Sequence, residues 1–339
     1  MFHQDQSNHI FQLLAAKVPC VITVHRNPDG DALGSALGLM HFLESKFHAK
    51  ADVVVPDAFP HFLDWLPGSD KIVIAENQPD RAKELFNNSK LIFCLDFNDV
   101  SRTAGVQEIL AKSPAYKVMI DHHRNPTDFC QAVYSDITAS STSEMVLRWI
   151  VHQQSQHLVG KNAAECLYTG IMTDTGSFRF ESCSFVTHEM VAILLKTGIE
   201  HWNIHERILN QNTLQKLQLW GLAFNERMVH LPKFRTAYIY LTEEDLQKHH
   251  YREGDLEGLV NYALSIQDTL MGALFSQRDG KVRISFRSVG SFPVNDLSGK
   301  YFSGGGHLNA AGGVSDLPLD KTIEKFLSIL PLYDQLQYK

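Results

Sequence analysis

The chain has 339 residues, of which 44% are apolar and 20% charged, and its formal net charge is −7. These values are typical of a soluble globular enzyme with one or two domains. The negative charge argues against binding to long duplex nucleic acid or to an anionic membrane, and we find no run of about 18 apolar residues that would predict a membrane helix.

The N-terminal segment and the cysteines favour a cytoplasmic protein. The sequence MFHQDQSNHIFQLLAAK has no basic segment followed by a long apolar run, so we expect no secretory signal. The five cysteines are dispersed without a CxxC pair. This pattern predicts reduced thiols in the core, not a disulfide framework or a zinc ribbon.

The first part of the sequence predicts a parallel β-sheet covered by helices. Apolar runs that read as strands lie at 20–25, 51–56, 71–75, 91–96 and 117–121. Between the first two, apolar residues from Leu33 to Leu43 repeat at helical spacing. Strands that are apolar on both faces and alternate with helices are typical of parallel α/β sheets.

A more helical stretch follows the last of these strands. Helical patterns lie at 140–154, 162–176 and 187–198. Ser141 or Thr142, placed before Glu144, is a predicted N-terminal cap, and Gly198 is a predicted helix stop.

The sequence then predicts a connector and a second α/β domain. Residues 202–228 read as one long helical segment, polar enough to join two domains. Asp279-Gly280, between two predicted strands, is a hairpin signal. We therefore expect a first domain at 1–204, a helical linker at 205–228 and a smaller second domain at 229–339.

Polar side chains follow three predicted strands of the first domain. They come from the strand ends and from the end of one helical run, and they are His25, Asp29, Asp31, Asp96, Asp121, His122, His123 and Asp174. A single strand-end Asp is usually a helix cap, and a single His is usually structural. Since the carboxyl ends of parallel strands meet at one edge, we expect this set to converge on one metal site.

The ligand types indicate which metals this site would bind. Carboxylates with one or two imidazoles and no thiolate suit Mn²⁺ or Mg²⁺, with Fe²⁺, Co²⁺ or Zn²⁺ as alternatives. Even six ligands from this set of eight residues are too many for one catalytic ion. They fit two ions roughly 3.5–4 Å apart that share a carboxylate, generate a hydroxide and clamp a phosphoryl group. The chemistry alone predicts a two-metal hydrolase.

Four segments in this order, HRNPDGDALGSALGL, LDFND, DHHRN and TGIMTDTGSFRF, resemble the four motifs of the DHH phosphoesterases. The family includes manganese pyrophosphatases, exopolyphosphatases, the RecJ exonuclease and small nanoRNases that also act on 3′-phosphoadenosine 5′-phosphate (pAp). The resemblance implies that His25 and Asp29 bind a first metal and that Asp96 bridges to a second. The remaining ligands of the second metal would be Asp31, His122 and Asp174.

The resemblance also implies roles for residues beside the metals. The expected catalytic residues are Asp96, His122 and His123, with His123 facing the substrate phosphate. Asp121 would support the histidines from behind. Arg102 matches a basic position that could contact a phosphate, although a plain surface arginine is an equal alternative.

The segment YFSGGGHLNAAGG at 301–313 is the chemical signal of the second domain. Glycines before a histidine let backbone N–H groups approach an anion, although an ordinary glycine-rich loop is the alternative. With Arg287 upstream, the segment resembles the DHH-associated C-terminal domain, which also occurs in alanyl-tRNA synthetases. The substrate-binding candidates it implies are Arg287, Gly304, Gly305, Gly306 and His307, with arginine suited to phosphate.

The resemblance is greatest to the nanoRNase/pAp phosphatase branch. It implies a cytoplasmic phosphoesterase, an oligoribonuclease and 3′(2′),5′-bisphosphate nucleotidase with two divalent ions, Mn²⁺ first and Mg²⁺, Co²⁺ or Fe²⁺ as alternatives. Its substrates would be short RNA oligonucleotides and pAp, without long duplex nucleic acid or a membrane, and a homodimer is compatible. The alternatives are an exopolyphosphatase or inorganic pyrophosphatase, a hydrolase of linear dinucleotides, and an inactive nucleotide-binding module.

Overall fold

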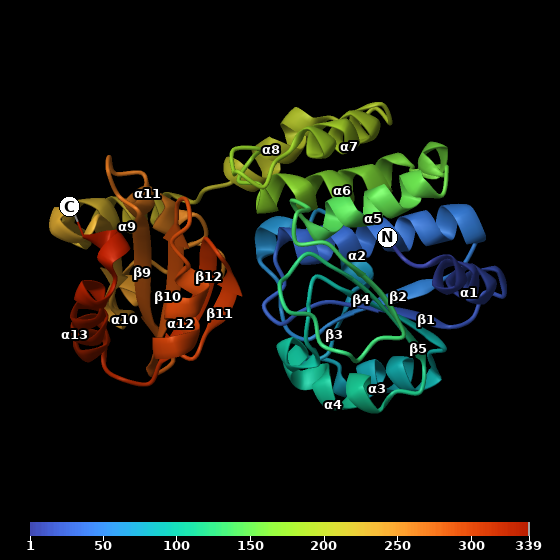
Figure 1. The fold of residues 1–339 in the computed structure, drawn as a ribbon, viewed down its shortest axis with the longest axis horizontal. Helices are drawn as coiled ribbons and strands as arrows, with labels where there is room; N and C mark the ends of the chain where they lie inside the picture. Colours follow the sequence, from blue (N-terminus) through green and yellow to red (C-terminus); the bar gives the residue numbers. More distant parts are fainter. Residues whose placement is uncertain (338–339) are drawn as a thin grey trace. The chain divides into compact units, whose positions relative to one another are not determined.

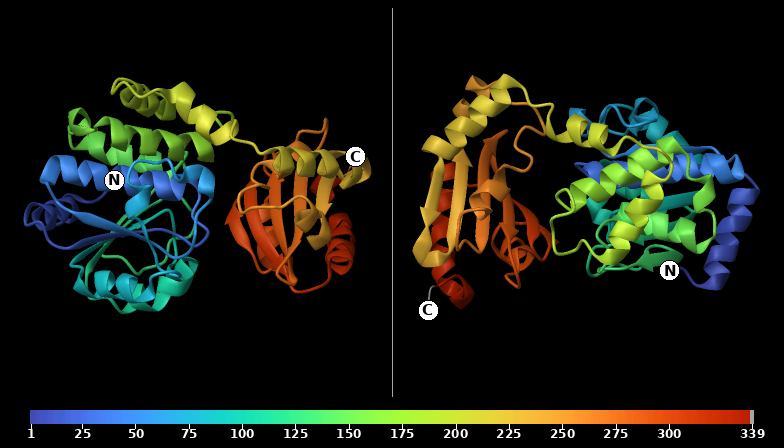
Figure 2. Two further views of the ribbon diagram at one scale, coloured as in Figure 1. Left: turned by 180° about the vertical axis from the view of Figure 1, so that it is seen from behind. Right: turned by 90° about the horizontal axis from the view of Figure 1, so that it is seen from above.

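The structure is a computed structural model that describes residues 1–337. The chain forms two compact units, Met1–Gln211 and Asn212–Lys339, each with one six-stranded sheet (Figures 1 and 2). The predicted α/β class is therefore confirmed. The five cysteines are free thiols; four of them are buried, as predicted, and Cys183 is only partly buried. Among the described residues, no helix combines the length and apolar character needed to cross a membrane.

The sheet of the first unit is parallel throughout, with strand order β3-β2-β1-β4-β5-β6. Its strands are β1 (Cys20–Thr23), β2 (Ala51–Val55), β3 (Val73–Ile74), β4 (Leu91–Leu95), β5 (Tyr116–Asp121) and β6 (Ala132–Ser135). The five predicted strands are all present with slightly different ends, and β6 is an addition that the sequence pattern did not indicate.

Helices cover both faces of this sheet (Figure 1). The helices of the first unit are α1 (Gln4–Ala15), α2 (Gly30–Phe47), α3 (Pro79–Asn88), α4 (Gln107–Lys112), α5 (Thr142–His152), α6 (Lys161–Asp174), α7 (Phe185–Leu195) and α8 (His201–Leu209). The α2, α5 and α6 helices lie on one face, and α3 and α4 lie on the other. Burial of both faces explains why the strands are almost wholly apolar.

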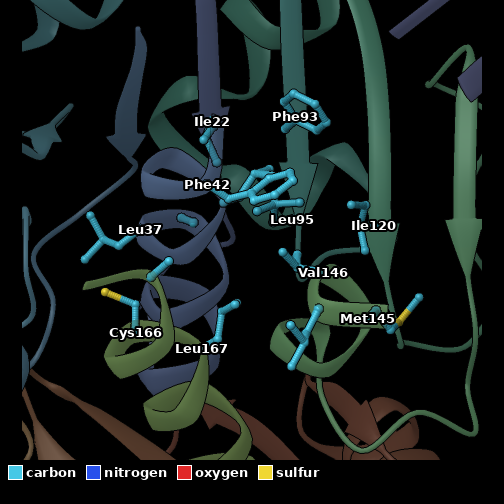
Figure 3. Close-up of a cluster of buried hydrophobic side chains, with 14 of the residues drawn as sticks. Ile22, Leu37, Phe42, Phe93, Leu95, Ile120, Met145, Val146, Cys166 and Leu167 are labelled. Atoms are coloured by element: carbon cyan, nitrogen blue, oxygen red, sulfur yellow. The ribbon is translucent and has the colours of Figure 1, made fainter. Parts of the chain in front are cut away.

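The larger core lies between the sheet and α2, α5 and α6 (Figure 3). Phe93 and Leu95 of β4 point into it together with Phe42 of α2 and Val146 of α5. All four side chains are at most 1% exposed. Burial of each stabilises the unit by about 1.5–3 kcal/mol, so this face fixes the helices whose ends carry the polar residues described below.

The prediction of one continuous helix over 202–228 is wrong. The structure has two helices there, α8 and α9 (Leu214–Glu226), separated by residues 210–213. Thr213 caps α9 by accepting a hydrogen bond from Lys216 N at 3.1 Å. A threonine in extended conformation satisfies a free N–H at a helix start, so it begins a new helix instead of continuing the old one.

The second unit holds a mixed sheet with order β11-β12-β10-β9-β8-β7. Its strands are β7 (Met228–Leu231), β8 (Thr236–Leu241), β9 (Met271–Arg278), β10 (Lys281–Ser288), β11 (Gly305–His307) and β12 (Ala310–Ser315), and its remaining helices are α10 (Glu243–Lys248), α11 (Leu259–Leu264), α12 (Val294–Tyr301) and α13 (Leu319–Ile329). The predicted hairpin joins β9 to β10: Asp279 and Gly280 have φ of 53° and 72°, as a two-residue hairpin turn requires.

Candidate metal centre and substrate-binding residues

The predicted ligands of the first unit meet at the carboxyl edge of its sheet. His25 follows β1, Asp96 follows β4 directly, and Asp121 is the last residue of β5. The chain runs from β1 to β2 on one side, while β4 pairs with β1 on the other. Ligands of open α/β sheets bind at such a switch in strand order.

Asp96 lies between two histidines from different strands. Its Oδ2 is 3.2 Å from His25 Nε2, and its Oδ1 is 3.4 Å from His122 Nε2. Its backbone has φ of 63°, a left-handed conformation that costs free energy outside glycine. Each carboxylate oxygen therefore faces a different ligand group.

Two groups of ligand atoms share Asp96. His25, Asp29 and Asp96 each offer an atom within 4.8 Å of the others, and so do Asp31, Asp96 and His122. Asp174, the last residue of α6, joins the second group, since its Oδ2 is 3.4 Å from His122 Nε2. The structure thus brings all six expected metal ligands together.

Asp29 serves as a helix cap and also faces the first ligand group. Its Oδ1 accepts hydrogen bonds from Asp31 N and Ala32 N, both at 3.0 Å, at the start of α2. Its Oδ2 is 3.9 Å from His25 Nε2. Asp29 can therefore be a helix cap and a metal ligand at the same time, because Oδ1 accepts the capping hydrogen bonds and Oδ2 faces the ligand group.

Asp121 contacts His123, and a separate carbonyl orients His122. The His123 Nδ1 lies 2.7 Å from Asp121 Oδ1, and His123 N donates to Oδ2 at 3.1 Å. The His122 Nδ1 lies 3.3 Å from Ala139 O, which leaves Nε2 directed at the carboxylates. Such contacts fix the ring orientation that a metal ligand needs.

The electrostatics of the cluster favour a bound cation. Burial raises the pKa of Asp31 well above its usual range, and the neighbouring Asp96 and Asp174 carboxylates raise it further. Burial would also raise the pKa of Asp96, but hydrogen bonds with His122 and His25 bring it well below its usual range. Buried carboxylates that repel each other, set beside imidazoles, form a donor set that fits divalent cations.

Arg102 is the basic residue beside this cluster. It belongs to a 3₁₀ turn, Val100–Val106, and its carbonyl accepts a hydrogen bond from Arg26 N at 2.7 Å. Burial, together with the positive charge of Arg102, lowers the pKa of His123 well below its usual range. The arginine is therefore close enough to act electrostatically on the site.

Three further residues position the site, and the sequence indicated none of them in that role, since its pattern marks Thr142 only as a possible helix cap. Thr142 and Ser143, at the start of α5, donate backbone hydrogen bonds to Asp31. Asp57 accepts a hydrogen bond from Asn27 N at 2.6 Å and so holds the loop that follows His25. The one available signal was the capping pattern at Ser141 or Thr142, and the structure shows that Ser141 is the cap: its Oγ accepts a hydrogen bond from Glu144 N at 3.0 Å.

The glycine segment of the second unit forms a strand, and its glycines have different roles. A Cβ at Gly304 would lie 2.7 Å from Gly313 Cα, and one at Gly306 would lie 2.9 Å from Ala311 Cα, so packing requires both glycines. A Cβ at Gly305 would meet no heavy atom within 4 Å among residues 1–337. Gly305 therefore leaves the backbone open to a ligand.

Arg287 and His307 lie in one row across this sheet. Both pair with Ala310, Arg287 from β10 and His307 from β11. Directly paired residues of antiparallel strands point to the same face, so both side chains share the face of Gly305, two residues from His307. The structure thus brings the predicted substrate-binding residues of this unit together.

The fold and the first cluster define an α/β protein with a site suited to divalent cations at the edge of a parallel sheet. Two family profiles match the chain, the DHH family N-terminal domain over residues 19–171 and the DHHA1 domain over residues 235–331. A crystal structure of an exopolyphosphatase-related protein from Bacteroides fragilis is 38% identical with a TM-score of 0.93, covering 99% of this chain and 98% of that chain. The chain belongs to the DHH family of phosphoesterases.

Two named relatives are similar along most of the chain. The bifunctional oligoribonuclease and PAP phosphatase NrnA of Thermus thermophilus is 29% identical over 93% of this chain and 90% of its own length. The protein of the same name from Bacillus subtilis is 27% identical over 86% of this chain and 88% of its own length. The similarity therefore covers both units.

Proposed function

We propose that this chain is a metal-dependent phosphoesterase that hydrolyses very short RNA oligonucleotides to mononucleotides and removes the 3′-phosphate of pAp. The observation that carries the proposal is Asp96, whose two oxygens face two different ligand groups. Similarity to two proteins named as oligoribonucleases and PAP phosphatases supports this choice of substrates.

The proposal assigns each ligand to one of two divalent cations. His25 and Asp29 would hold one cation, and Asp96 would hold both. The other cation would be held by Asp31, His122 and Asp174. Mn²⁺ is the first choice, because the donor set is rich in oxygen with imidazole and no thiolate. When bound, such cations neutralise charge on phosphoryl oxygens and make water a nucleophile at neutral pH.

The remaining residues would bind and orient the substrate. His123, held by Asp121 at 2.7 Å, would face the phosphate, and Arg102 would stabilise its negative charge. In the second unit, Arg287 and His307 would bind the nucleotide, with the backbone of 305–306 beside them, whereas Gly304 N already donates to Ser298 O at 3.3 Å. The bidentate guanidinium of arginine suits a phosphate.

Asp96→Asn tests the shared ligand. Because the change touches both ligand groups, we expect it to remove Mn²⁺ binding and to lower kcat/KM for pAp by more than about 100-fold. Asp70→Asn, an exposed aspartate away from the cluster, is the matched control and should behave as the unchanged protein. Near-normal turnover of Asp96→Asn with Mn²⁺ would show that the shared-ligand assignment is wrong.

The substrate assignment is tested by hydrolysis rates with Mn²⁺ on one panel of RNA dimers, longer oligomers, linear dinucleotides, pAp, pyrophosphate and polyphosphate. We expect the RNA dimers and pAp to be the best substrates. Polyphosphate hydrolysis is the second candidate, because the Bacteroides fragilis protein is described as exopolyphosphatase-related. Hydrolysis of none of these compounds would favour a nucleotide-binding module.

A further inference from the structure

The N-terminus of α5 holds one of the proposed metal ligands at both of its oxygens. Thr142 and Ser143 are the first residues of this helix, and N–H groups in the first turn have no helical carbonyl to bond. Thr142 N donates to Asp31 Oδ2 at 2.6 Å, and Ser143 N donates to Asp31 Oδ1 at 2.9 Å. The carboxylate plane of Asp31 is therefore fixed by the backbone of α5.

The Thr142 side chain extends this arrangement to Asp96. Thr142 Oγ1 donates to Asp96 Oδ1 at 3.0 Å. The same oxygen faces His122 Nε2 at 3.4 Å, whereas Oδ2 faces His25. Thr142, Asp31 and Asp96 are at most 2% exposed, so water competes little for these bonds. Thr142 thus contacts both carboxylates of the second ligand group through different atoms.

The start of α5 is itself held by buried contacts. Glu144 is fully buried, accepts a hydrogen bond from Thr187 Oγ1 at 2.8 Å and forms an ion pair with Arg148. On the opposite side, a Cβ at Gly170 of α6 would overlap Ser143 Oγ. Both contacts keep this turn at a fixed position relative to Asp31.

We propose that Thr142 is a positioning residue for the second metal site, and this inference rests on the proposed two-metal function. Its hydroxyl and its N–H hold Asp96 and Asp31, whose ligand atoms lie within 4.8 Å of each other, so less reorganisation is needed when the cation binds. Because Thr142 contacts Oδ1 of Asp96 and not Oδ2, loss of its hydroxyl weakens the second site and spares the first.

The test compares three variants of the full chain. Thr142→Val removes the hydroxyl while it keeps the shape and the N–H, and Thr142→Ser keeps the hydroxyl. Thr322→Val is the matched control, since it removes a buried hydroxyl that bonds Ser315 Oγ in the second unit, which holds none of the proposed metal ligands. Each protein is stripped of metal and titrated with Mn²⁺, and electron paramagnetic resonance measures the Mn²⁺ that stays free.

We expect the unchanged protein to bind two Mn²⁺ ions. Thr142→Val should bind the first with nearly the same affinity and the second about 10–100-fold more weakly. Thr142→Ser should restore the second affinity, and Thr322→Val should keep both. Hydrolysis of pAp by Thr142→Val should recover as Mn²⁺ is raised.

Different results overturn different parts of the assignment. Normal binding of both ions by Thr142→Val, or equal weakening in Thr142→Ser, would refute the positioning role. Fewer than two ions bound by the unchanged protein would instead refute the two-metal arrangement itself. If Thr142→Val does not fold, Thr142→Ala replaces it, and its comparison with Thr142→Ser decides in the same way.

Discussion

Glycine is a packing requirement where α2 and α6 cross. A Cβ at Gly34 would lie 2.5 Å from Cys166 O and 2.8 Å from Gly170 N. The close approach matters for the site, because Asp31 lies at the start of α2 and Asp174 at the end of α6. The two helices can bring these carboxylates to one place only if their backbones touch.

We therefore expect Gly34→Ala to lower the free energy of unfolding of the first unit by about 1–3 kcal/mol, because it overpacks this contact. Gly221→Ala is the matched control: its Cβ would meet no heavy atom within 4 Å in the part of the chain that the structure describes. In the exposed α9 helix this change should stabilise by up to about 1 kcal/mol. Differential scanning calorimetry measures both, and equal effects of the two changes would contradict the packing argument.

At this scale, the sequence predicted the site residues that carry their own chemistry. Carboxylates and imidazoles after strands could be grouped by residue type and position, as for His25 and Asp96. Thr142 and Asp57 could not be found this way. Each acts through a hydrogen bond to a residue far away in the chain, and such a bond depends on how the elements pack.

Among the elements, β11 contains two neighbouring glycines, of which one is required for packing and the other is proposed to meet the substrate. Gly306 has φ of 143° and a crowded Cβ position, while Gly305 is open on the face that carries Arg287 and His307. Packing therefore requires glycine at 306, whereas at 305 the proposed substrate would require it.

Gly305→Ala should leave the melting temperature unchanged and raise KM for pAp roughly 10-fold, because its methyl group would occupy the face proposed to meet the nucleotide. Gly306→Ala should lower the melting temperature, because its backbone conformation and contacts exclude a side chain. Steady-state kinetics and thermal melting of both variants measure the difference. An unchanged KM for Gly305→Ala would count against substrate binding at this strand.

Elements with a strong local signal could be predicted, and elements without one could not. The Asp279-Gly280 turn fixed the β9–β10 hairpin, since few residue pairs adopt two positive φ values. The break between α8 and α9 was missed because 202–228 keeps helical composition throughout. The cap at Thr213 marks it, but a single threonine does not settle a helix start, since Thr169 lies inside α6.

For the whole molecule, the proposed metal ligands all belong to the first unit, Met1–Gln211. Each unit also has its own hydrophobic core. A ligand that binds one folded unit stabilises that unit by mass action, so the two units should respond differently to metal.

We expect Mn²⁺ at about 100 times the dissociation constant of each site to stabilise the first unit by roughly 2.7 kcal/mol per ion, or roughly 5 kcal/mol for both, and to raise its melting temperature by roughly 10–20 °C. The transition of the second unit should stay where it is. Calorimetry of the full chain with Mn²⁺ and then with excess chelator measures both transitions. A metal-dependent shift confined to the transition of the second unit would show that the metal centre has been assigned to the wrong unit.

The fold class could be predicted because the periodicity of apolar residues reports directly on sheets covered by helices. The exact division at Gln211 could not, because α8 and α9 have similar composition and only packing assigns each to its unit.

The proposed ligands extend from His25 to Asp174 along the chain, through the ends of strands and helices that meet only when the first unit is assembled. Because bringing such distant segments together costs loop-closure entropy, we expect the complete ligand set to form only after the folding barrier has been crossed. Interactions absent at that barrier slow unfolding and leave the folding rate unchanged. Bound cations would therefore slow the unfolding of the first unit and prolong the lifetime of its folded state.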